Sequence, residues 1–406
     1  MQKPLNLLFA CLVSPALLLA VCPTSTCQPD GTQASGAKYR ICMPDTSCWN
    51  GNLVVFAHGY VAPGQPIAIP EDQLTINGVS LPGLINQLGY GFAVSSYSTN
   101  GLAILQGIQD SEDLVKIFSN TVGTPQRVYI AGASEGGLVS ALSIEQAPSV
   151  YHAALPACGP IGDFQFQINY IGDFRVIFDY FFPGVIPGSP VLIPSAVMDN
   201  WTTVYVPAIL GALQANPSAT AQFLNVTDFP IGPDPNTTAQ NIVGLLWYNV
   251  FGTNDAIAKL GGQPFDNRTR LYFGSANDLQ LNLKVERFKA DAQALAEIAA
   301  HYQTTGKISR PVVTLHTTSD PIIPYLHEPL YTLKTLFSGS FLQHVNVPVS
   351  AYGHCNFQES DLLLSFGLLV FKDTGQLLPA GAKTVLPEKE QKKFETQSMD
   401  LGLSLR

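Results

Sequence analysis

The sequence is short of charge. Charged residues make up 13% of its 406 residues, against roughly 25% in an ordinary soluble domain. Hydrophobic residues reach 46%, so the chain is not disordered, because disorder requires low hydrophobicity together with high charge. Lysine and arginine number 21 against 30 aspartates and glutamates, which excludes a basic nucleic-acid-binding protein. The length fits one large domain or two of medium size.

Long hydrophobic runs are also scarce. Only the segment from Leu5 to Cys22, which follows Lys3, approaches the ~18 residues needed to span a membrane. A basic start, an apolar stretch and a polar end are typical of a secretory signal peptide, which we place at residues 1–22. A membrane anchor is the alternative, and Leu19 to Cys22 also resembles a bacterial lipoprotein box. We expect a secreted or periplasmic protein with no integral membrane segment in its mature chain.

Motifs for metals and nucleotides are missing. The sequence has no His-Glu-x-x-His and no Cys-x-x-Cys pair, which are spacings typical of zinc sites. It contains neither G-x-G-x-x-G nor a phosphate-binding loop. We therefore expect no metal, no cofactor and no nucleic-acid partner.

What the sequence does contain is a series of short apolar runs rich in β-branched residues. They cover residues 53–57, 91–97, 127–131, 151–155, 311–315 and 345–349. Such runs suit strands buried on both faces, as in a parallel sheet. Helices are predicted between them at 110–120 (with Asp110 as the cap), 136–146 and 359–371. This alternation predicts an α/β fold with a mostly parallel central sheet flanked by helices.

The alternation stops between the two parts of this core, which we place at residues 23–158 and 308–380. The intervening residues 159–307 are too many for a loop, and we interpret them as a large, mainly helical cap insertion. Helices are expected at 203–214, 240–251 and 283–303, the last with one apolar face. Residues 381–406 are charged and predicted to form a peripheral C-terminal tail.

The sharpest motif is Gly132-Ala133-Ser134-Glu135-Gly136, between a predicted strand and a predicted helix. This is G-x-S-x-G in strand–turn–helix context, the arrangement of a nucleophile elbow. The glycines leave room in a tight turn, and the helix directs its first N–H groups toward developing negative charge. We predict Ser134 as a nucleophile; a capping serine in an ordinary turn is the alternative.

A second feature is the sequence His58-Gly59-Tyr60 at the end of another predicted strand. Beside a nucleophile elbow, the loop after such a strand supplies one amide N–H to an oxyanion hole, and the residue after the nucleophile supplies the other. We expect Tyr60 and Glu135 in these roles. The His58 ring is expected to be structural and bonded to backbone.

A serine nucleophile needs a base. Of the seven histidines, His354 follows the last predicted strand, at the edge where open α/β sheets place their sites. Asp320 follows the preceding strand and is predicted to orient His354, with an Asp-Pro turn as the alternative. Nucleophile, acid and base then occur in the chain order Ser134, Asp320, His354, which is the order of α/β-hydrolases.

With these residues in place, the chain resembles a secreted α/β-hydrolase-fold serine hydrolase of esterase or lipase type over residues 40–158 and 308–372. The sequence Ser-Asp-Pro-x-x-Pro around Asp320 is similar to prolyl-oligopeptidase and lipase-like branches. The His354-Cys355 pair resembles the tannase and feruloyl-esterase group, in which this cysteine bridges to one beside the serine. Here Ala133 precedes Ser134 instead.

The chain has seven cysteines, of which Cys11 falls in the predicted signal peptide. The others can form disulfides in an oxidising compartment. Four lie between residues 22 and 48, which predicts local bridges there. Cys158 and Cys355 follow strands that end at one edge of the sheet, so we expect them to pair; two buried free thiols are the alternative.

These features predict a carboxylic-ester hydrolase that works through an acyl-enzyme on an apolar or aromatic ester, small or polymeric. A serine peptidase is the alternative, because the fold supports both chemistries. A peptidase that captures a free N-terminus needs carboxylates in its pocket, for which Asp163, Asp173 and Asp179 are the candidates. A binding module without catalysis is the third hypothesis, and the complete set of nucleophile, acid and base argues against it.

Overall fold

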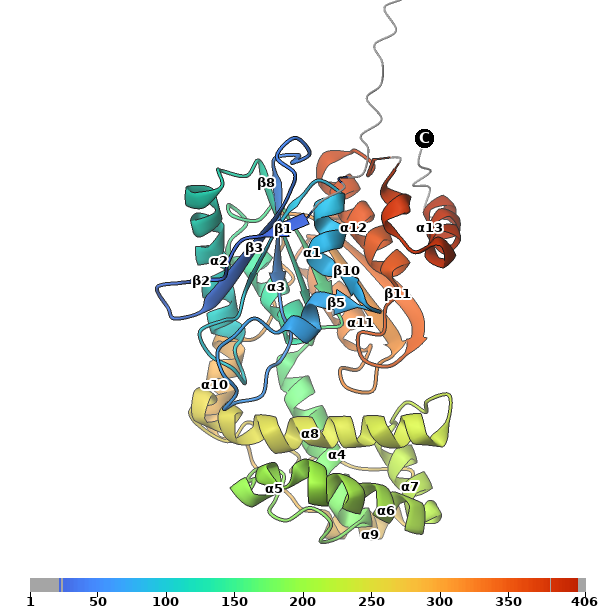
Figure 1. Ribbon diagram of the computed structural model, residues 1–406. Coiled ribbons are helices and arrows are strands. Elements are labelled where there is room, and N and C mark those ends of the chain that lie inside the picture. The colour runs from blue at the N-terminus through green and yellow to red at the C-terminus, as the bar shows by residue number, and fades with distance from the viewer. Residues whose placement is uncertain (1–21, 23–24, 380, 401–406) are drawn as a thin grey trace, which may run out of the picture.

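The computed structural model describes residues 22, 25–379 and 381–400 (Figure 1). The predicted signal peptide lies outside the described residues except for Cys22. Among the described residues, no helix has both the length and the apolar character needed to cross a membrane.

A nine-stranded sheet forms the centre of the molecule (Figure 1). Its strands are β1 (Ser25–Cys27), β2 (Gly31–Thr32), β3 (Lys38–Pro44), β4 (Asn52–Ala57), β7 (Gly91–Ser95), β8 (Arg127–Ala133), β9 (Ala153–Ala157), β10 (Val312–Ser319) and β11 (His344–Tyr352). A separate ribbon pairs β5 (Thr75–Ile76) with β6 (Val79–Ser80) after the 3₁₀-helix η1 (Glu71–Leu74).

The strands follow the spatial order β1-β3-β7-β4-β8-β9-β10-β11, with β2 paired to β3. All neighbours from β7 to β11 are parallel, whereas β3 runs antiparallel to β7. The exchange of β7 and β4 relative to chain order, with one antiparallel strand near the start, defines the α/β-hydrolase fold. The predicted fold class is confirmed.

Helices cover both faces of the sheet. They are α1 (Leu81–Gln87), α2 (Ile104–Thr121), α3 (Glu135–Gln146), α11 (His327–Phe337), α12 (Glu359–Thr374) and α13 (Glu388–Asp400), with the short η3 (Phe341–Gln343) and η4 (Ala382–Val385). Val55 and Ile130 face the core shared with α2 and α3. Their neighbours Val54 and Tyr129 face the core shared with α12. Because adjacent strand residues point to opposite faces, both faces need apolar side chains, and this accounts for the apolar runs.

The residues between β9 and β10 are mainly helical. They form α4 (Phe164–Phe181), α5 (Ser195–Asp199), the π-helix η2 (Trp201–Tyr205), α6 (Val206–Ala215), α7 (Pro217–Thr227), α8 (Pro235–Leu260), α9 (Asp278–Lys284) and α10 (Ala292–His301). Helices α4 to α9 gather beyond one end of the sheet (Figure 1), around a separate apolar cluster that includes Phe174, Phe178 and Phe223. We call residues 164–284 the helical region.

Several expected boundaries are wrong. The single helix expected at 283–303 is two helices, α9 and α10, because Val285 adopts an extended conformation. The connecting chain instead bonds to a distant loop, where Asn267 Oδ1 accepts from the Phe288 N–H at 2.7 Å. Helix α2 begins at Ile104, so Asp110 does not cap it; its carboxylate accepts from the Ser98 N–H at 2.7 Å.

The C-terminal segment is more than a charged extension. Helix α13 packs against α12, and its Phe394 is only 3% exposed. Polar contacts join the same two helices, since Ser360 Oγ donates to Glu390 at 2.7 Å and Lys393 Nζ lies 2.8 Å from an Asp361 oxygen. The segment from residue 388 to 400 therefore covers the outer side of α12.

Candidate active site

Ser134 stands at the sharp turn between β8 and α3. Its backbone has φ 59° and ψ −123°, a conformation that non-glycine residues rarely adopt and that is typical of strained functional turns. The turn needs its glycines, because a Cβ at Gly132 would lie 2.0 Å from the Gly136 carbonyl oxygen. A Cβ at Gly136 would lie 2.0 Å from the Ala57 carbonyl oxygen. The G-x-S-x-G sequence thus fixes Ser134 at the carboxyl end of β8.

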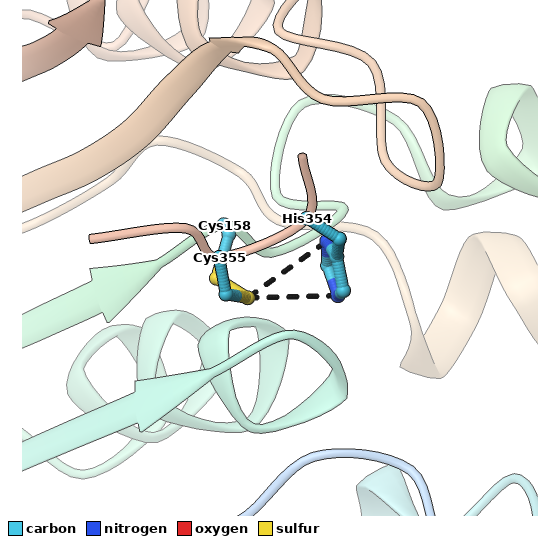
Figure 2. A group of neighbouring side chains, drawn as sticks. All are labelled: Cys158, His354 and Cys355. Carbon is cyan, nitrogen blue, oxygen red and sulfur yellow. Dashed lines mark hydrogen bonds between the residues drawn. A yellow bond between two sulfur atoms is a disulfide. The ribbon is translucent and has the colours of Figure 1, made fainter. Parts of the chain in front are cut away.

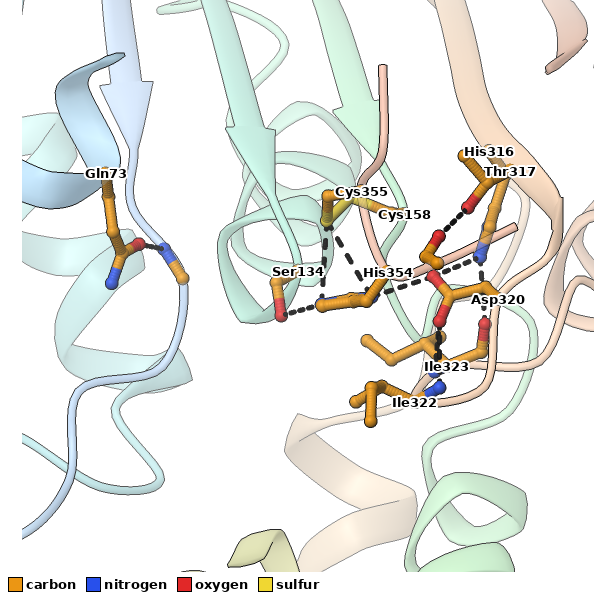
Figure 3. The surroundings of a disulfide bond; sticks show 12 residues. Gln73, Ser134, Cys158, His316, Thr317, Asp320, Ile322, Ile323, His354 and Cys355 are labelled. Carbon is orange, nitrogen blue, oxygen red and sulfur yellow. Dashed lines mark hydrogen bonds and ion pairs between the residues drawn. A yellow bond between two sulfur atoms is a disulfide. The ribbon is translucent and has the colours of Figure 1, made fainter. Parts of the chain in front are cut away.

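The structure brings Ser134, His354 and Asp320 together (Figure 3). His354 Nε2 lies 2.8 Å from Ser134 Oγ, and His354 Nδ1 lies 2.7 Å from Asp320 Oδ2. With Asp320 ionised, Nδ1 carries the proton and donates to the carboxylate. Nε2 is then left to accept from the Ser134 hydroxyl.

Asp320 is 2% exposed, and its two oxygens have separate partners. Oδ1 accepts from the backbone N–H groups of Ile322 and Ile323 at 2.8 and 3.0 Å, which leaves Oδ2 for His354. Burial alone would raise the pKa of Asp320, but the charge of His354 and hydrogen bonds from His316 and His354 hold it well below its usual range. Asp320 therefore does both things that were considered for it: it forms a turn with Pro321, and it directs a carboxylate oxygen at His354.

A second histidine, His316, lies beside Asp320 and was not predicted as a site residue. The His316 side chain has no exposed surface; its Nε2 lies 3.5 Å from Asp320 Oδ2, and its Nδ1 lies 3.2 Å from Glu328 Oε1. Burial alone would lower the pKa of His316, but hydrogen bonds to Asp320 and Glu328 raise it to about 10. His316 is therefore a buried cation between two carboxylates. Its only signal in the sequence is its place at the end of a predicted strand, four residues before Asp320.

Of the two amides expected in the oxyanion hole, that of Glu135 directly follows Ser134, and that of Tyr60 follows β4, the strand paired with β8. Among the described residues, neither the Tyr60 N–H nor the Glu135 N–H has a protein acceptor. The neighbouring Gly59 N–H is occupied, because Gln73 Oε1 accepts from it at 2.6 Å. Gln73 was not predicted, since it belongs to the short helix η1 and contacts Gly59 from 14 residues away along the chain. It leaves the Tyr60 N–H as a free donor in this loop, among the described residues.

The side chain of Glu135 is buried next to Ser134 in the chain. Its Oε1 accepts from the Ala103 N–H at 3.0 Å, and its Oε2 has no partner in the described part of the chain. Burial raises the pKa of Glu135 to about 8, and the Ala103 N–H and the charge of Lys259 offset this only in part. Glu135 therefore carries a proton at neutral pH.

Cys158 and Cys355 form a disulfide that closes a separation of 197 residues (Figure 2). It joins the end of β9 to the loop that carries His354. Together with His354 these cysteines place three ligand-type atoms within 4.8 Å, but the sulfurs are bonded to each other and are not the thiolates that a metal binds. A second disulfide joins Cys27 to Cys42, within the segment where local bridges were predicted. The other two cysteines of that segment, Cys22 and Cys48, are free, so only one local bridge forms there.

Among the described residues, none of the remaining histidines forms a hydrogen bond with Ser134. The His58 ring donates from Nδ1 to the Gly59 carbonyl oxygen at 2.7 Å and stacks on Tyr97, in line with its expected structural role. His327 Nε2 pairs with Gln167, and His344 pairs with Thr314. His152 precedes β9 rather than lying within it, and His301 is on α10.

Two cavities meet at Ser134, and Tyr60 and Tyr248 line both of them. The inner cavity, of 340 Å³, lies between the sheet and helices α1 and α12. The outer cavity, of 130 Å³, lies toward α4 and α8. Neither is lined by Asp163, Asp173 or Asp179, the carboxylates considered for a peptidase.

Those three carboxylates have structural partners instead. Asp163 caps α4 by accepting from the Phe166 N–H, and Asp179 pairs with Arg175 at 2.8 Å. Asp173 accepts from the Tyr272 hydroxyl at 2.6 Å.

No family model matches the sequence, and no curated protein matches it either. Solved structures do match. Feruloyl esterase B from Aspergillus oryzae is 13% identical with a TM-score of 0.45, over 86% of this chain and 81% of that chain. The rice cell wall degrading esterase LipA from Xanthomonas oryzae is 15% identical with a TM-score of 0.42, over 89% and 93%.

An acylaminoacyl peptidase is also similar, at 10% identity and a TM-score of 0.44; this chain spans only 42% of its length. Esterases and peptidases thus both occur among the similar structures. The fold assignment rests on strand order and direction, and no activity is transferred from proteins at this distance.

Proposed function

We propose that the protein is a secreted serine carboxylic-ester hydrolase that acts through an acyl-enzyme. Ser134 is the nucleophile, His354 the base, and Asp320 the residue that orients His354. The observation that carries the proposal is the chain of hydrogen bonds from Asp320 through His354 to Ser134, at 2.7 and 2.8 Å. This chain ends where two cavities meet.

The reaction follows from these positions. His354 Nε2 takes the Ser134 proton as Oγ bonds to the ester carbonyl carbon, and the carbonyl oxygen becomes an oxyanion facing the Tyr60 and Glu135 amides. The intermediate collapses, the bond to the alcohol oxygen breaks, and His354 gives its proton to that oxygen. Water, deprotonated by His354, then attacks the acyl-enzyme and releases the acid and Ser134.

An ester is favoured over a peptide by the surroundings of Ser134. The carboxylates that would hold a free N-terminus are occupied elsewhere. Among the described residues, Glu135 is the one carboxyl group that lines either cavity, and its raised pKa of about 8 leaves it uncharged at neutral pH. An uncharged acid does not provide the counter-ion that an ammonium group requires.

Secretion is supported by two disulfides, which persist in oxidising compartments. The basic and then apolar N-terminal sequence supports it as well. Mass spectrometry of the protein recovered from the medium of the producing cells identifies its N-terminal residue. This measurement tests the predicted cleavage near Cys22. Recovery of the whole chain inside the cells would contradict secretion.

The test of the catalytic proposal is Ser134→Ala, with Ser218→Ala on the exposed side of α7 as the matched control. The Ser134 variant should lose p-nitrophenyl ester hydrolysis by about 10⁵-fold or more in kcat. It should also lose labelling by a fluorophosphonate, while Ser218→Ala keeps both. Near-normal turnover by folded Ser134→Ala would overturn the assignment. A panel of aryl esters, alkyl esters and peptide amides then separates esterase from peptidase.

A further inference from the structure

The inner cavity extends from Ser134 into the body of the fold. Its lining begins with Ser134 and His354 and reaches Val54 and Phe92, which pair with each other across β4 and β7. Val54 also pairs with Tyr129, five positions before Ser134 on β8. At a rise of about 3.3 Å per strand residue, the cavity is about 16 Å deep.

The inner end of the cavity is apolar. It is formed by Val54, Leu88, Phe92 and Phe366, none of which carries a polar group. Phe366 marks this depth independently, because its ring packs against Tyr90 and Tyr129 at centroid distances of 5.1 and 6.0 Å. A hydroxyl or charged group placed here would lose its hydrogen bonds to water without replacement.

A cavity of 340 Å³ that opens at Ser134 and extends among apolar side chains is unusual in a well-packed fold. Cores pack to the density of organic crystals, and an unfilled cavity destabilises the fold in proportion to its volume. Small side chains keep this one open, since Ala131, Ala133 and Ala157 line it along β8 and β9. A space of this size that opens at a nucleophile is typical of a ligand site.

We propose that the inner cavity binds the acyl chain of a medium-length alkyl ester, and this assignment rests on the proposed function. Carbon–carbon bonds of about 1.5 Å advance an extended chain by about 1.25 Å per carbon, so about 12 to 13 carbons span the depth of about 16 Å. The carbonyl carbon lies at Ser134 and the terminal methyl group lies near Phe366. The ester's alcohol then leaves toward the outer cavity.

The outer cavity, on the other side of Ser134, is left for the alcohol. Its lining includes Gln167, Asn249 and Gln263 as well as Glu135. Those amide side chains already bond within the protein, so the apolar inner end is the feature that selects the acyl chain. A hydroxylated aromatic acyl group fits less well than an alkyl chain, because its hydroxyl would lie at the apolar end.

The first experiment is a chain-length series of p-nitrophenyl esters from acetate to palmitate. Each buried methylene group favours binding by about fourfold, so kcat/KM should rise at least about 100-fold from acetate to decanoate and then fall at palmitate. Loss of this hydrolysis in Ser134→Ala tests the proposed function separately. If hydrolysis depends on Ser134 but is fastest for acetate or for a hydroxycinnamoyl ester, only the acyl-chain assignment fails.

The second experiment fills the cavity. Ala131 lies three residues before Ser134, about 10 Å along β8, so Ala131→Phe places a ring across the middle of the channel. The ratio of decanoate to acetate kcat/KM should fall at least about 30-fold, because several methylene groups lose their site. Ala221→Phe, on the exposed side of α7, should leave the ratio unchanged. An unchanged ratio in folded Ala131→Phe would overturn the proposal.

A binding measurement keeps the test independent of turnover. Decanoate should raise the melting temperature of Ser134→Ala and should not raise that of the double variant Ser134→Ala/Ala131→Phe. Equal stabilisation of both variants would place the fatty acid elsewhere and contradict the assignment.

Discussion

The carboxyl edge of the sheet and the helical region (residues 164–284) are built in different ways. At the edge, backbone atoms leave no space for a side chain at Gly132 or Gly136, and every buried oxygen of Asp320 has a defined partner. In the helical region, aromatic rings such as Phe174 and Phe223, with centroids 4.8 Å apart, form a broad apolar cluster. The structure of the carboxyl edge depends on exact backbone geometry, whereas the packing of the helical region depends on the size and hydrophobicity of its side chains.

The same difference separates the residues proposed for catalysis from the residues that line the outer cavity. Ser134, His354 and Asp320 all follow strands of the sheet, whereas the helical region lines mainly the outer cavity. Packing of large apolar groups tolerates exchange better than a tight turn or a buried charge does. We therefore expect changes at the edge to abolish turnover and changes in the helices to alter stability or KM.

The strongest test of this contrast makes the same type of substitution, aspartate to asparagine, once in each region. Asp320→Asn should lower kcat by about 10⁴-fold, because an amide no longer selects the His354 tautomer that accepts from Ser134. Asp173→Asn, in α4, removes a carboxylate paired with Tyr272 and Arg270. It should lower the melting temperature and leave kcat within about threefold of normal. Steady-state kinetics and thermal melting of both variants check the prediction, and similar kcat values would contradict it.

Glycine gives a second comparison. Gly132→Ala should lower the free energy of unfolding by about 4 kcal/mol, because its Cβ would lie 2.0 Å from a backbone oxygen that cannot move aside. Gly211→Ala, on α6, meets nothing within 4 Å and should raise stability by about 0.5 to 1 kcal/mol through helix propensity. Urea unfolding measures both changes, and equal effects at the two glycines would remove the distinction between the regions.

The two disulfides offer a third comparison, this time within the sheet domain. Replacing both cysteines of either bridge by serine should cost about 2 to 4 kcal/mol of unfolding free energy. Only Cys158→Ser/Cys355→Ser should also lower kcat, because Cys355 adjoins His354 whereas Cys27 and Cys42 lie at the opposite strands β1 and β3. Kinetics and urea unfolding of the two double variants check this. A kcat loss in the Cys27→Ser/Cys42→Ser variant would argue against a local effect on His354.

The same contrast explains what could be predicted from the sequence. The parallel strands were predictable because burial on both faces produces apolar runs, and Ser134 was predictable because its turn excludes side chains beside it. Strand β3 was missed, since its half-buried residues such as Tyr39 and Arg40 do not form such a run. The expected helix at 283–303 followed a correct apolar pattern, but the bonds from residue 288 to Asn267 depend on a loop about 20 residues away. Patterns along one segment do not report contacts of this kind.

At the candidate site, the residues found from the sequence are those that follow strands. Gln73 and His316 were missed because each acts on a neighbour across space, Gln73 by occupying the Gly59 N–H and His316 by its position beside Asp320. Glu135 was expected only for its backbone amide. The burial of its side chain depends on the contact with Ala103 at the start of α2. A G-x-S-x-G motif does not encode that contact.

Glu135 leads to the prediction with the smallest expected effect. Its pKa of about 8 means that the side chain is neutral below this pH and becomes an anion above it, one residue from Ser134. A negative charge there opposes the developing oxyanion, so kcat should fall by up to about tenfold as the pH rises from 7 to 10. Glu135→Gln keeps the shape of the neutral acid and should hold kcat constant over the same range.

The stability of the fold should follow the same titration. Because the folded-state pKa of Glu135 is raised above its unfolded value of about 4.3, the folded protein binds the extra proton between those two values. The free energy of unfolding should therefore fall as the pH rises through this window and level off above about 8. Glu135→Gln should reduce that slope, as measured by urea unfolding between pH 5 and 9. If the variant and the natural protein lose activity and stability in parallel, the titrating group is another residue, and His316, with a pKa of about 10, is the next to replace.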